Sequence, residues 1–233
     1  MKNVILCNNC SSENDFYKKS CDKCKAILRE RVVNIDLWET IWRLFYEPKR
    51  AFSKIVWAEH KNFTIMILAL LGMKFLINGF FINNLIVAED IFPTSSLISI
   101  LISFGLLLSL VIVFALILKV LLILYEIKTR LKDNIAVITY SFIPILFALV
   151  VLFPVEYALF GKHWIIFNPS PFFIRSSAAW LLSGIELILM IWSLVLLIIG
   201  VNVQSASRIF SIIIGVILTI LLNLAFLKFV TFL

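Results

Sequence analysis

Five long apolar segments fill the chain from residue 62 to its end. They cover residues 62–83, 95–125, 134–153, 178–200 and 207–232. Each has close to the ~20 residues that an α-helix needs to cross the hydrocarbon core of a bilayer. A soluble domain of 233 residues does not need five fully apolar segments of that length. The pattern therefore predicts an all-α integral membrane protein whose domain at residues 62–233 is a bundle of five transmembrane helices.

The composition agrees with a membrane protein and excludes a nucleic-acid-binding arm. Hydrophobic residues make up 62% of the chain and charged residues 15%, against about 45–50% and about 25% in average soluble domains. Twelve of the 21 Lys and Arg lie before residue 62, where eight of the 14 acidic residues are mixed with them. A nucleic-acid arm would instead show a long run of one sign. The predicted partner is the lipid bilayer.

The positions of the basic residues predict an orientation. Besides the twelve before the first span, residues 126–133 carry Lys128, Arg130 and Lys132, whereas the connection at residues 84–94 has no Lys or Arg and carries Glu89 and Asp90. An excess of Lys and Arg marks the cytoplasmic side of a membrane protein. The N-terminus is therefore expected in the cytoplasm, and five crossings place the C-terminus outside.

All four cysteines lie in the N-terminal 30 residues, on the side predicted to be cytoplasmic. They are Cys7, Cys10, Cys21 and Cys24, arranged as two CxxC motifs. Four thiolates at this spacing are typical of a tetrahedral zinc site, and a closed site of this kind is structural. Residues 1–30 are therefore predicted to form a zinc ribbon with structural Zn²⁺. Two disulfides, disfavoured in a reducing compartment, or free thiols are the alternatives.

The segment between the two motifs is polar, with Phe16 and Tyr17 expected to form a miniature core. So small a fragment cannot bury enough apolar area to fold alone, so metal binding would supply its stability. The region resembles the short zinc ribbons at the start of many bacterial membrane proteins. Such ribbons usually carry Gly after the second Cys of each motif, where this chain has Ser11 and Lys25.

Residues 31–61 form an amphipathic region between the ribbon and the first span. The apolar residues that recur at helical spacing are Leu37, Trp38, Ile41, Trp42 and Phe45, and, after Pro48, Phe52, Ile55, Val56 and Trp57. Pro48 fits the first turn of a second helix. Several Trp opposite basic residues indicate helices that lie in the headgroup layer. A helix pair that caps the cytoplasmic ends of the spans is the alternative.

Three short motifs resemble the Yip family, the Rab-GTPase-interacting membrane proteins. They are Arg43–Ile55 with its Pro-Lys-Arg-Ala-Phe segment, Tyr140-Ser-Phe-Ile-Pro144, and Trp192–Gly200 followed by Ser205-Ala-Ser-Arg208. The resemblance is to bacterial members and covers roughly Leu37–Leu233. It implies a five-helix domain with the N-terminus inside, and a bacterial inner membrane. The Tyr-Gly-Pro-type signature of the eukaryotic trafficking relatives is missing, so the resemblance does not carry over their Rab contacts.

Polar residues inside the predicted spans define a second candidate site. Lys74 lies twelve residues after residue 62, and Glu186 fourteen before Gly200. At a rise of 1.5 Å per residue, both lie roughly 18–21 Å from the cytoplasmic edge. With Asn78 and Asn223 at similar depth, they are hypothesised to form one polar cluster. Intramembrane charges usually face a bundle interior or cavity, so the cluster is either a substrate or proton site, or a structural pair.

Two further features concern the third span. Pro144 is expected to kink it, with the freed carbonyl groups satisfied by neighbours such as Ser141. The following connection at residues 154–177 is rich in aromatic residues. Such a connection is typical of the aromatic belt at the membrane surface, and a re-entrant lid over a cavity is the alternative.

No motif for catalysis is found in the sequence. His60 and His163 are the two histidines, and they are predicted to lie on opposite sides of the membrane. Phosphate-binding loops, nucleophile elbows and HExxH motifs are absent. The sequence favours a non-enzymatic scaffold that organises membrane or recruits a cytoplasmic protein through its ribbon. The alternative is a small-solute or ion permease, or a channel subunit, that uses Lys74 and Glu186; an oligomer fits either role.

Overall fold

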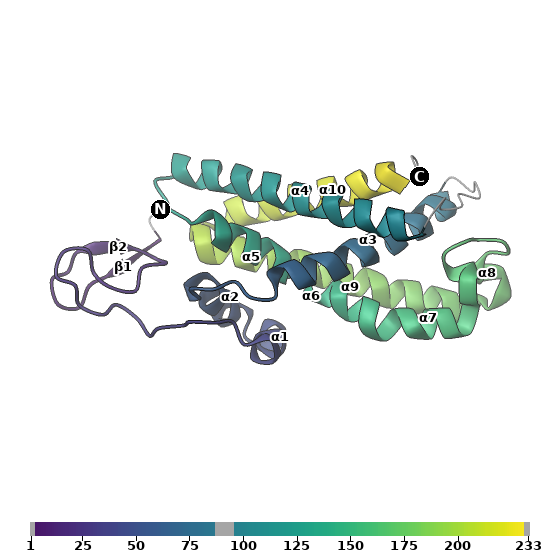
Figure 1. Ribbon diagram of the computed structural model, residues 1–233, viewed down its shortest axis with the longest axis horizontal. Helices are drawn as coiled ribbons and strands as arrows, with labels where there is room; N and C mark the ends of the chain where they lie inside the picture. Colours follow the sequence, from purple (N-terminus) through teal and green to yellow (C-terminus); the bar gives the residue numbers. More distant parts are fainter. Residues whose placement is uncertain (1–2, 87–95, 231–233) are drawn as a thin grey trace. The chain divides into compact units, whose positions relative to one another are not determined.

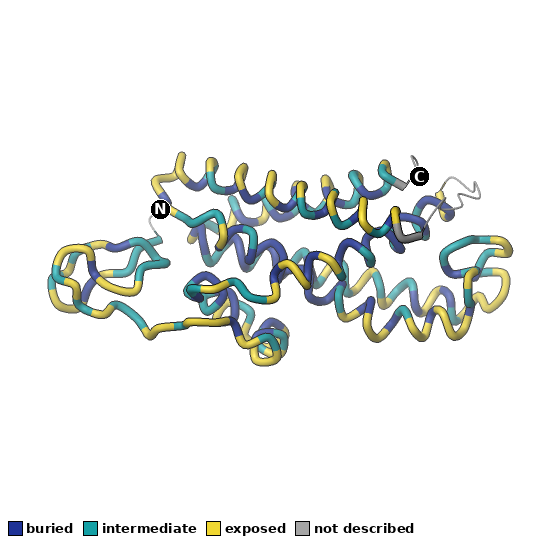
Figure 2. Tube along the Cα trace, in the orientation of Figure 1, coloured by how far each residue is buried: buried dark blue, intermediate teal, exposed yellow. Residues whose placement is uncertain are grey.

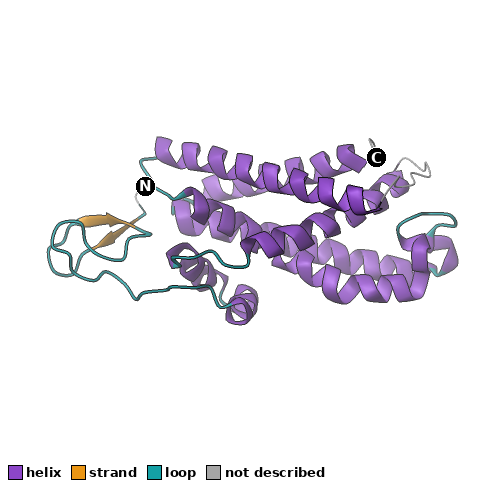
Figure 3. Cartoon of the chain, in the orientation of Figure 1, coloured by secondary structure: helices purple, strands orange, loops and turns teal. Residues whose placement is uncertain are grey.

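The computed structural model describes residues 3–86 and 96–230 of the chain (Figure 1). Figure 3 shows a pair of strands near the N-terminus and helices over most of the remaining described chain. The residues group into two compact units. The first unit comprises Met1–Ile65, Val111–Ser141 and Val195–Val216, and the second comprises Met66–Leu110, Phe142–Leu194 and Ile217–Leu233. Glu89, Asp90 and the predicted span limits at residues 95 and 232 lie outside the described residues.

Two short strands and two short helices precede the long apolar helices. Strand β1 (Val4–Leu6) pairs antiparallel with β2 (Glu13–Asp15). Helix α1 (Leu37–Tyr46) begins after Asp36, whose side chain accepts a hydrogen bond from the backbone N–H of Glu39, a common N-cap arrangement. Helix α2 begins with Pro48 and ends at Trp57, and proline is well suited to the first turn because it has no N–H to leave unpaired.

The remaining elements are helical. They are α3 (Thr64–Ile86), α4 (Ser96–Leu124), α5 (Leu131–Ser141), α6 (Ile143–Phe147), the π-helical η1 (Ala148–Leu152), α7 (Phe153–Phe160), the 3₁₀ helix η2 (Gly161–Trp164), α8 (Pro171–Ile174), α9 (Ser176–Ser205) and α10 (Arg208–Val230). Within them, five segments are long and apolar enough to cross a bilayer: Thr64–Ile86, Ile98–Leu124, Ile143–Trp164, Ser176–Ser205 and Arg208–Phe229. The predicted all-α membrane fold with five spans is confirmed.

The third span differs in position from the sequence prediction. It was expected at residues 134–153, whereas the apolar candidate is Ile143–Trp164. Helix α5 ends at Ser141, and Phe142 leaves the helical conformation just before Pro144. Proline cannot donate the backbone hydrogen bond that would continue the helix, and the Ser141 hydroxyl donates to the carbonyl oxygen of Val137 at 2.7 Å. Residues 153–164, which the sequence placed mostly in a loop, are helical as α7 and η2.

Each unit has its own apolar core. In the first unit, α9 comes so close to α2 and α5 at Gly200 that a Cβ atom there would lie 2.7 Å from Cγ1 of Val137 and 3.0 Å from the ring of Phe52. In the second unit, the Phe75 ring stacks on Phe226 with centroids 5.1 Å apart, and meets Phe142 edge-on. These contacts hold helices that are distant in sequence against each other within each unit.

Many residues along the long helices are exposed (Figure 2), and a large share of these exposed residues are large and apolar. Examples on α4 are Leu101, Val113, Val120 and Leu124, and examples on α10 are Ile209, Ile213 and Ile220, each at least 49% exposed. In water such faces would be unfavourable, but lipid tails are as apolar as these side chains. The exposed faces are those of a protein that lies in a bilayer.

Candidate functional site

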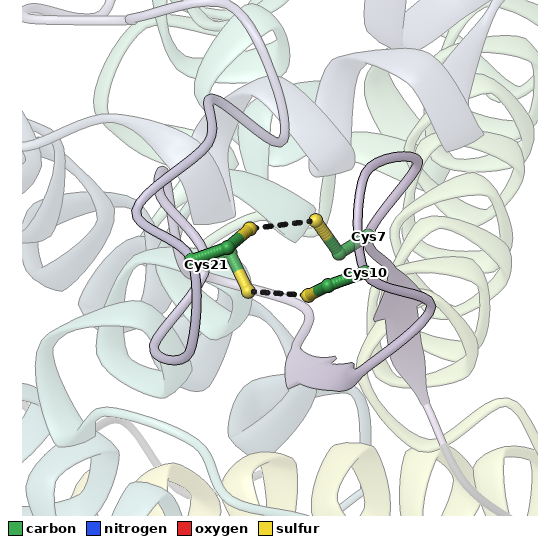
Figure 4. Close-up of side chains that lie close together, drawn as sticks. Cys7, Cys10 and Cys21 are labelled. Carbon is green, nitrogen blue, oxygen red and sulfur yellow. Dashed lines mark hydrogen bonds between the residues drawn. The ribbon is translucent and has the colours of Figure 1, made fainter.

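The four cysteines come together in the N-terminal ribbon. The Sγ atoms of Cys7 and Cys24 are 3.5 Å apart and those of Cys10 and Cys21 are 3.6 Å apart, as the dashed lines in Figure 4 mark. All four sulfurs lie within 4.8 Å of one another. A tetrahedral zinc site with Zn–S bonds of about 2.3 Å would separate its sulfurs by about 3.8 Å. The donor set and its spacing fit a metal ion of this kind.

Two matching backbone turns hold the thiols. In the first, the N–H of Ser11 donates to the carbonyl oxygen of Cys7 at 2.8 Å, and in the second, Lys25 donates to Cys21 at 3.1 Å. The φ angles of Ser11 and Lys25 are 54° and 62°. This left-handed region favours glycine because a Cβ atom is crowded there. These are the two positions where the ribbons that this region resembles usually carry glycine, and here Ser11 and Lys25 occupy them.

Polar side chains surround the sulfurs and fix their directions. The Ser12 hydroxyl lies 3.0 Å from Sγ of Cys10 and 3.1 Å from Sγ of Cys21. Buried Asn14 donates to the Ser12 carbonyl oxygen at 3.0 Å, and its side-chain oxygen accepts the N–H of Asp22 at 3.0 Å. Asn14 thus links the two turns, as outer groups of metal sites commonly do.

The same hydrogen bonds favour thiolates, the form that binds metal. The backbone N–H of Cys24 and the Ser12 hydroxyl lower the pKa of the Cys21 thiol to about 5. The backbone N–H of Ala26 acts in the same direction on Cys24, but the other three thiols and burial outweigh it and raise the pKa of Cys24 to about 11. Four adjacent thiolates repel one another, so full deprotonation of this set calls for a cation at its centre.

The ribbon is docked onto helices of the first unit. The Trp57 indole N–H donates to the carbonyl oxygen of Phe16 at 3.2 Å, and the two rings lie 5.5 Å apart. The guanidinium of Arg130 lies 4.9 Å from the centre of the Tyr17 ring. The expectation that Phe16 and Tyr17 form a core of the ribbon alone was incomplete, because both rings contact residues beyond it. Sequence spacing within the ribbon could not show this contact.

A second contact joins the start of the ribbon to α9. The side-chain amide of Asn3 donates to the carbonyl oxygens of Val203 at 2.7 Å and Gln204 at 2.9 Å. These carbonyls belong to the last turn of α9, where no further helical N–H is available to them. Asn3 therefore acts as a cap for α9 from the other end of the chain.

A buried charge network, which the sequence reasoning missed, lies beside this contact. Asp133 is 1% exposed and accepts from Lys61 at 2.9 Å and from Arg130 at 2.7 Å. Lys61 also donates to the carbonyl oxygens of Ala58 and Val56, at the end of α2, where a cation is favourable. Burial lowers the pKa of Lys61 to about 8, although Asp133 opposes the shift.

In the second unit, the predicted intramembrane residues are partly brought together. Lys74 and Glu186 form an ion pair although 112 residues separate them. The Lys74 side chain is buried, whereas the Glu186 side chain keeps 14% exposure. Asn78 and Glu186 both line a cavity of about 280 Å³. Asn223 instead donates to the carbonyl oxygen of Thr219 on its own helix at 2.8 Å.

A third charged residue joins this pair. Glu156 of α7 is fully buried, and neither of its carboxylate oxygens has a hydrogen-bond partner among the described residues. It interacts electrostatically with both Lys74 and Glu186. The sequence reasoning missed Glu156 because it ended the third span at residue 153. The sequence signal for a longer span was the apolar run that continues from Phe153 to Phe160, with Glu156 as its single acidic residue.

The aromatic residues predicted for an outer loop pack within the second unit. The Trp164 ring lies 4.9 Å from that of Phe81 on α3, and the Phe172 ring lies 4.8 Å from that of Trp180 on α9. Trp164 is 2% exposed and also lines the cavity beside Glu186. This aromatic cluster thus forms part of the surroundings of the charged residues.

These features define a helical integral membrane protein with five candidate spans and an N-terminal cysteine cluster. The family model of the Yip1 domain matches residues 42–228, and the chain belongs to the Yip1 domain family. The resemblance found in the sequence motifs is thereby confirmed. No curated protein matches the chain. No solved structure matches it either.

Proposed function

We propose that the protein is a non-enzymatic membrane scaffold whose cytoplasmic zinc ribbon recruits a protein partner. The domains proposed for this role are the ribbon at residues 1–30, the amphipathic helices at 31–61 and the five-span domain at 62–233. The N-terminus lies in the cytoplasm and the C-terminus outside, because most basic residues precede the first span. The membrane is the bacterial inner membrane, in line with the bacterial members that the sequence resembles.

The observation that carries this proposal is the docking of the ribbon. A ribbon tethered by a flexible linker would sample many positions, whereas Trp57, Arg130 and Asn3 hold this one against helices of its own unit. Two of its apolar side chains are exposed, Leu6 at 61% and Ile27 at 79%. Exposed apolar side chains on a docked and otherwise polar ribbon favour binding of another protein.

Helix α1 supports a role at the membrane surface. Its exposed face carries Trp38, Trp42 and Tyr46, which are 73%, 66% and 64% exposed. Tryptophan and tyrosine are enriched at the level of the lipid headgroups. Helix α2 is different, because its Phe52 and Ile55 are fully buried. We therefore infer that α1 is the interfacial helix and that α2 caps the helix ends of the first unit.

Two experiments test the scaffold. Metal analysis of purified protein should find one zinc per chain, and Cys7→Ser with Cys21→Ser should abolish it; a metal-free parent protein would refute the ribbon. A photo-crosslinking residue placed at Ile27 in cells should then trap a protein, and the same cysteine substitutions should remove the crosslink. Phe173, which is 89% exposed on α8, is the control position. Crosslinks that survive loss of the cysteines would contradict recruitment by the ribbon.

A second function is favoured by the buried ion pair. Lys74 and Glu186 lie beside a cavity of about 280 Å³, and intramembrane charges commonly mark ion or solute paths. On this proposal the protein is a small-solute or ion permease, or a subunit of a channel. Proteoliposomes with the purified protein should then show a flux that K74M abolishes. Transport would be contradicted if vesicles with the protein and vesicles without it showed equal flux for every ion and small solute in a panel.

A further inference from the structure

Three ionisable side chains meet inside the second unit, from three different helices. Lys74 comes from α3, Glu156 from α7 and Glu186 from α9. The Lys74 ammonium lies 6.0 Å from the centre of the Phe153 ring. Glu156 follows Phe153 by three residues, which places it on the same face of α7. The contact of Lys74 with this face therefore brings Glu156 beside the Lys74–Glu186 pair.

The charges of these three groups do not balance. Lys74 and Glu186 neutralise each other as an ion pair, which leaves the Glu156 carboxylate without a hydrogen-bond partner among the described residues. With both carboxylates ionised, the group would carry a net charge of −1 in an apolar interior. An unpaired charge of this kind is costly in a membrane, and two adjacent carboxylates disfavour each other's ionisation. One additional positive charge would neutralise the site.

We propose that Glu156, Glu186 and Lys74 form a proton-binding site that holds one exchangeable proton on its two carboxylates. The proton comes from water, adds to one carboxylate oxygen, and leaves by the same route. The resulting O–H can donate to the other carboxylate, which gives the unpartnered Glu156 a hydrogen bond. The occupied site is then neutral, with one ammonium, one carboxylate and one carboxylic acid.

The cavity beside the site supplies a route for the proton. Glu186 lines it together with Asn78 and Ser183, and the Ser183 hydroxyl has no hydrogen-bond partner in the described chain. Glu156 is fully buried and does not line this cavity. Glu186 therefore exchanges protons with the cavity, and Glu156 receives them from Glu186.

The surroundings of the site contain few other titratable groups. The groups that interact with Glu156 are Lys74, Glu186 and the Trp164 indole. An indole does not titrate in the physiological range. Phe153, Phe81 and Leu187 make the rest of these surroundings largely apolar. The proton equilibrium thus belongs to the two carboxylates as a pair, with Lys74 as their fixed counter-charge.

Infrared difference spectroscopy of the full-length protein in lipid nanodiscs tests the proposal. The parent protein should show one protonated carboxylic acid near neutral pH, whose C=O band disappears on alkaline titration and shifts in D₂O. Both E156Q and E186Q should remove this titrating band. E126Q, which changes an exposed glutamate, is the matched control and should leave it unchanged. Circular dichroism checks that each variant keeps its helix content.

The parent protein alone can overturn the proposal, so the test does not depend on whether a variant folds. Absence of any protonated carboxylic acid near neutral pH refutes it, and so does a titrating band that persists in both E156Q and E186Q. A band that responds to Na⁺ at constant pH would instead assign the site to a metal cation. This inference goes beyond the scaffold role and does not require transport. The flux and crosslinking experiments can fail while the proton band is present. The proton band can also be absent while flux or crosslinking is observed.

Discussion

Trp57 donates its indole N–H to the backbone carbonyl of Phe16 at 3.2 Å, and the Arg29 guanidinium lies 5.3 Å from the centre of the Trp57 ring. One side chain at the end of α2 therefore contacts two points of the N-terminal region. This relationship places the ribbon in contact with the helices of the first unit.

Replacement of Trp57 should release the ribbon without loss of its metal. W57A removes the ring and the N–H, whereas W57F keeps most of the ring contact. Hydrogen exchange of residues 11–30 should rise strongly in W57A and weakly in W57F, while zinc content stays at the parent level. W38A, at an exposed tryptophan of α1, is the control. Loss of zinc in W57A would show that docking and metal binding are one cooperative event.

Glycine at the two left-handed positions should strengthen the metal site. S11G and K25G remove the crowding of a Cβ atom at φ angles of 54° and 62°, while the extra chain freedom of glycine offsets part of the gain. A net gain of about 0.5–1 kcal/mol for each corresponds to a roughly two- to five-fold higher zinc affinity. Competition with a chelator measures it.

K23G provides the matched control, because Lys23 lies in the same turn as Cys21 and has no positive φ. Glycine there adds freedom to the unfolded chain without relief of strain, so zinc affinity should fall slightly. Equal effects of K23G and K25G would mean that backbone strain does not limit the site.

A methyl group at Gly200 should destabilise the first unit. Its Cβ atom would lie 2.7 Å from Cγ1 of Val137 and 3.0 Å from the Phe52 ring, and both side chains are fully buried. Overpacking of this kind typically costs about 1–3 kcal/mol. Thermal unfolding of G200A in detergent measures the loss.

The controls for this substitution are G105A and G184A, at helical glycines where a Cβ atom meets nothing within 4 Å. Alanine is the better helix former by up to about 1 kcal/mol. These variants should match or exceed the parent protein in stability. If G200A behaves like them, the close approach of α2, α5 and α9 is not rigid.

Lys61 should make stability depend on pH in the alkaline range. Its pKa is about 8 in the folded protein, below the ordinary value of 10.5, because of burial. Between these values the unfolded chain binds more protons, so this residue raises the free energy of unfolding as pH increases. Well below pH 8, the buried charge of Lys61 lowers the free energy of unfolding by its full amount, up to about 3 kcal/mol.

Thermal unfolding of K61M against the parent protein, at several pH values from about 7 to about 10, isolates this effect. The stability difference between the two proteins should change across the alkaline range. K128M, at an exposed lysine of the connection between α4 and α5, is the control. A constant difference for K61M would contradict the burial of its charge.

Removal of Lys74 alone should cost more than removal of the whole charged group. K74M leaves buried Glu156 and partly buried Glu186 without a counter-charge, and loss of one partner of a buried pair typically costs about 3–5 kcal/mol. The triple variant K74M/E156Q/E186Q removes all three ionisable groups and should regain most of this loss. Unfolding in detergent compares the two, and a triple variant less stable than K74M would contradict a shared charge balance.

The sequence by itself determined the membrane class, the family and the cysteine cluster. These depend on local signals, because helix length, apolar composition and CxxC spacing are visible along the chain. It also indicated the depth of Lys74 and Glu186, since a helix rises a fixed distance per residue.

Tertiary structure decided the features that depend on contacts between distant segments. Hydropathy could not show the helix break at Phe142, nor that Glu156 joins Lys74 and Glu186. The docking of Phe16 on Trp57 and the capping of α9 by Asn3 were also invisible, because nothing local specifies a partner 41 or 201 residues away. Periodicity fixes which face a residue occupies, but only packing decides what that face meets.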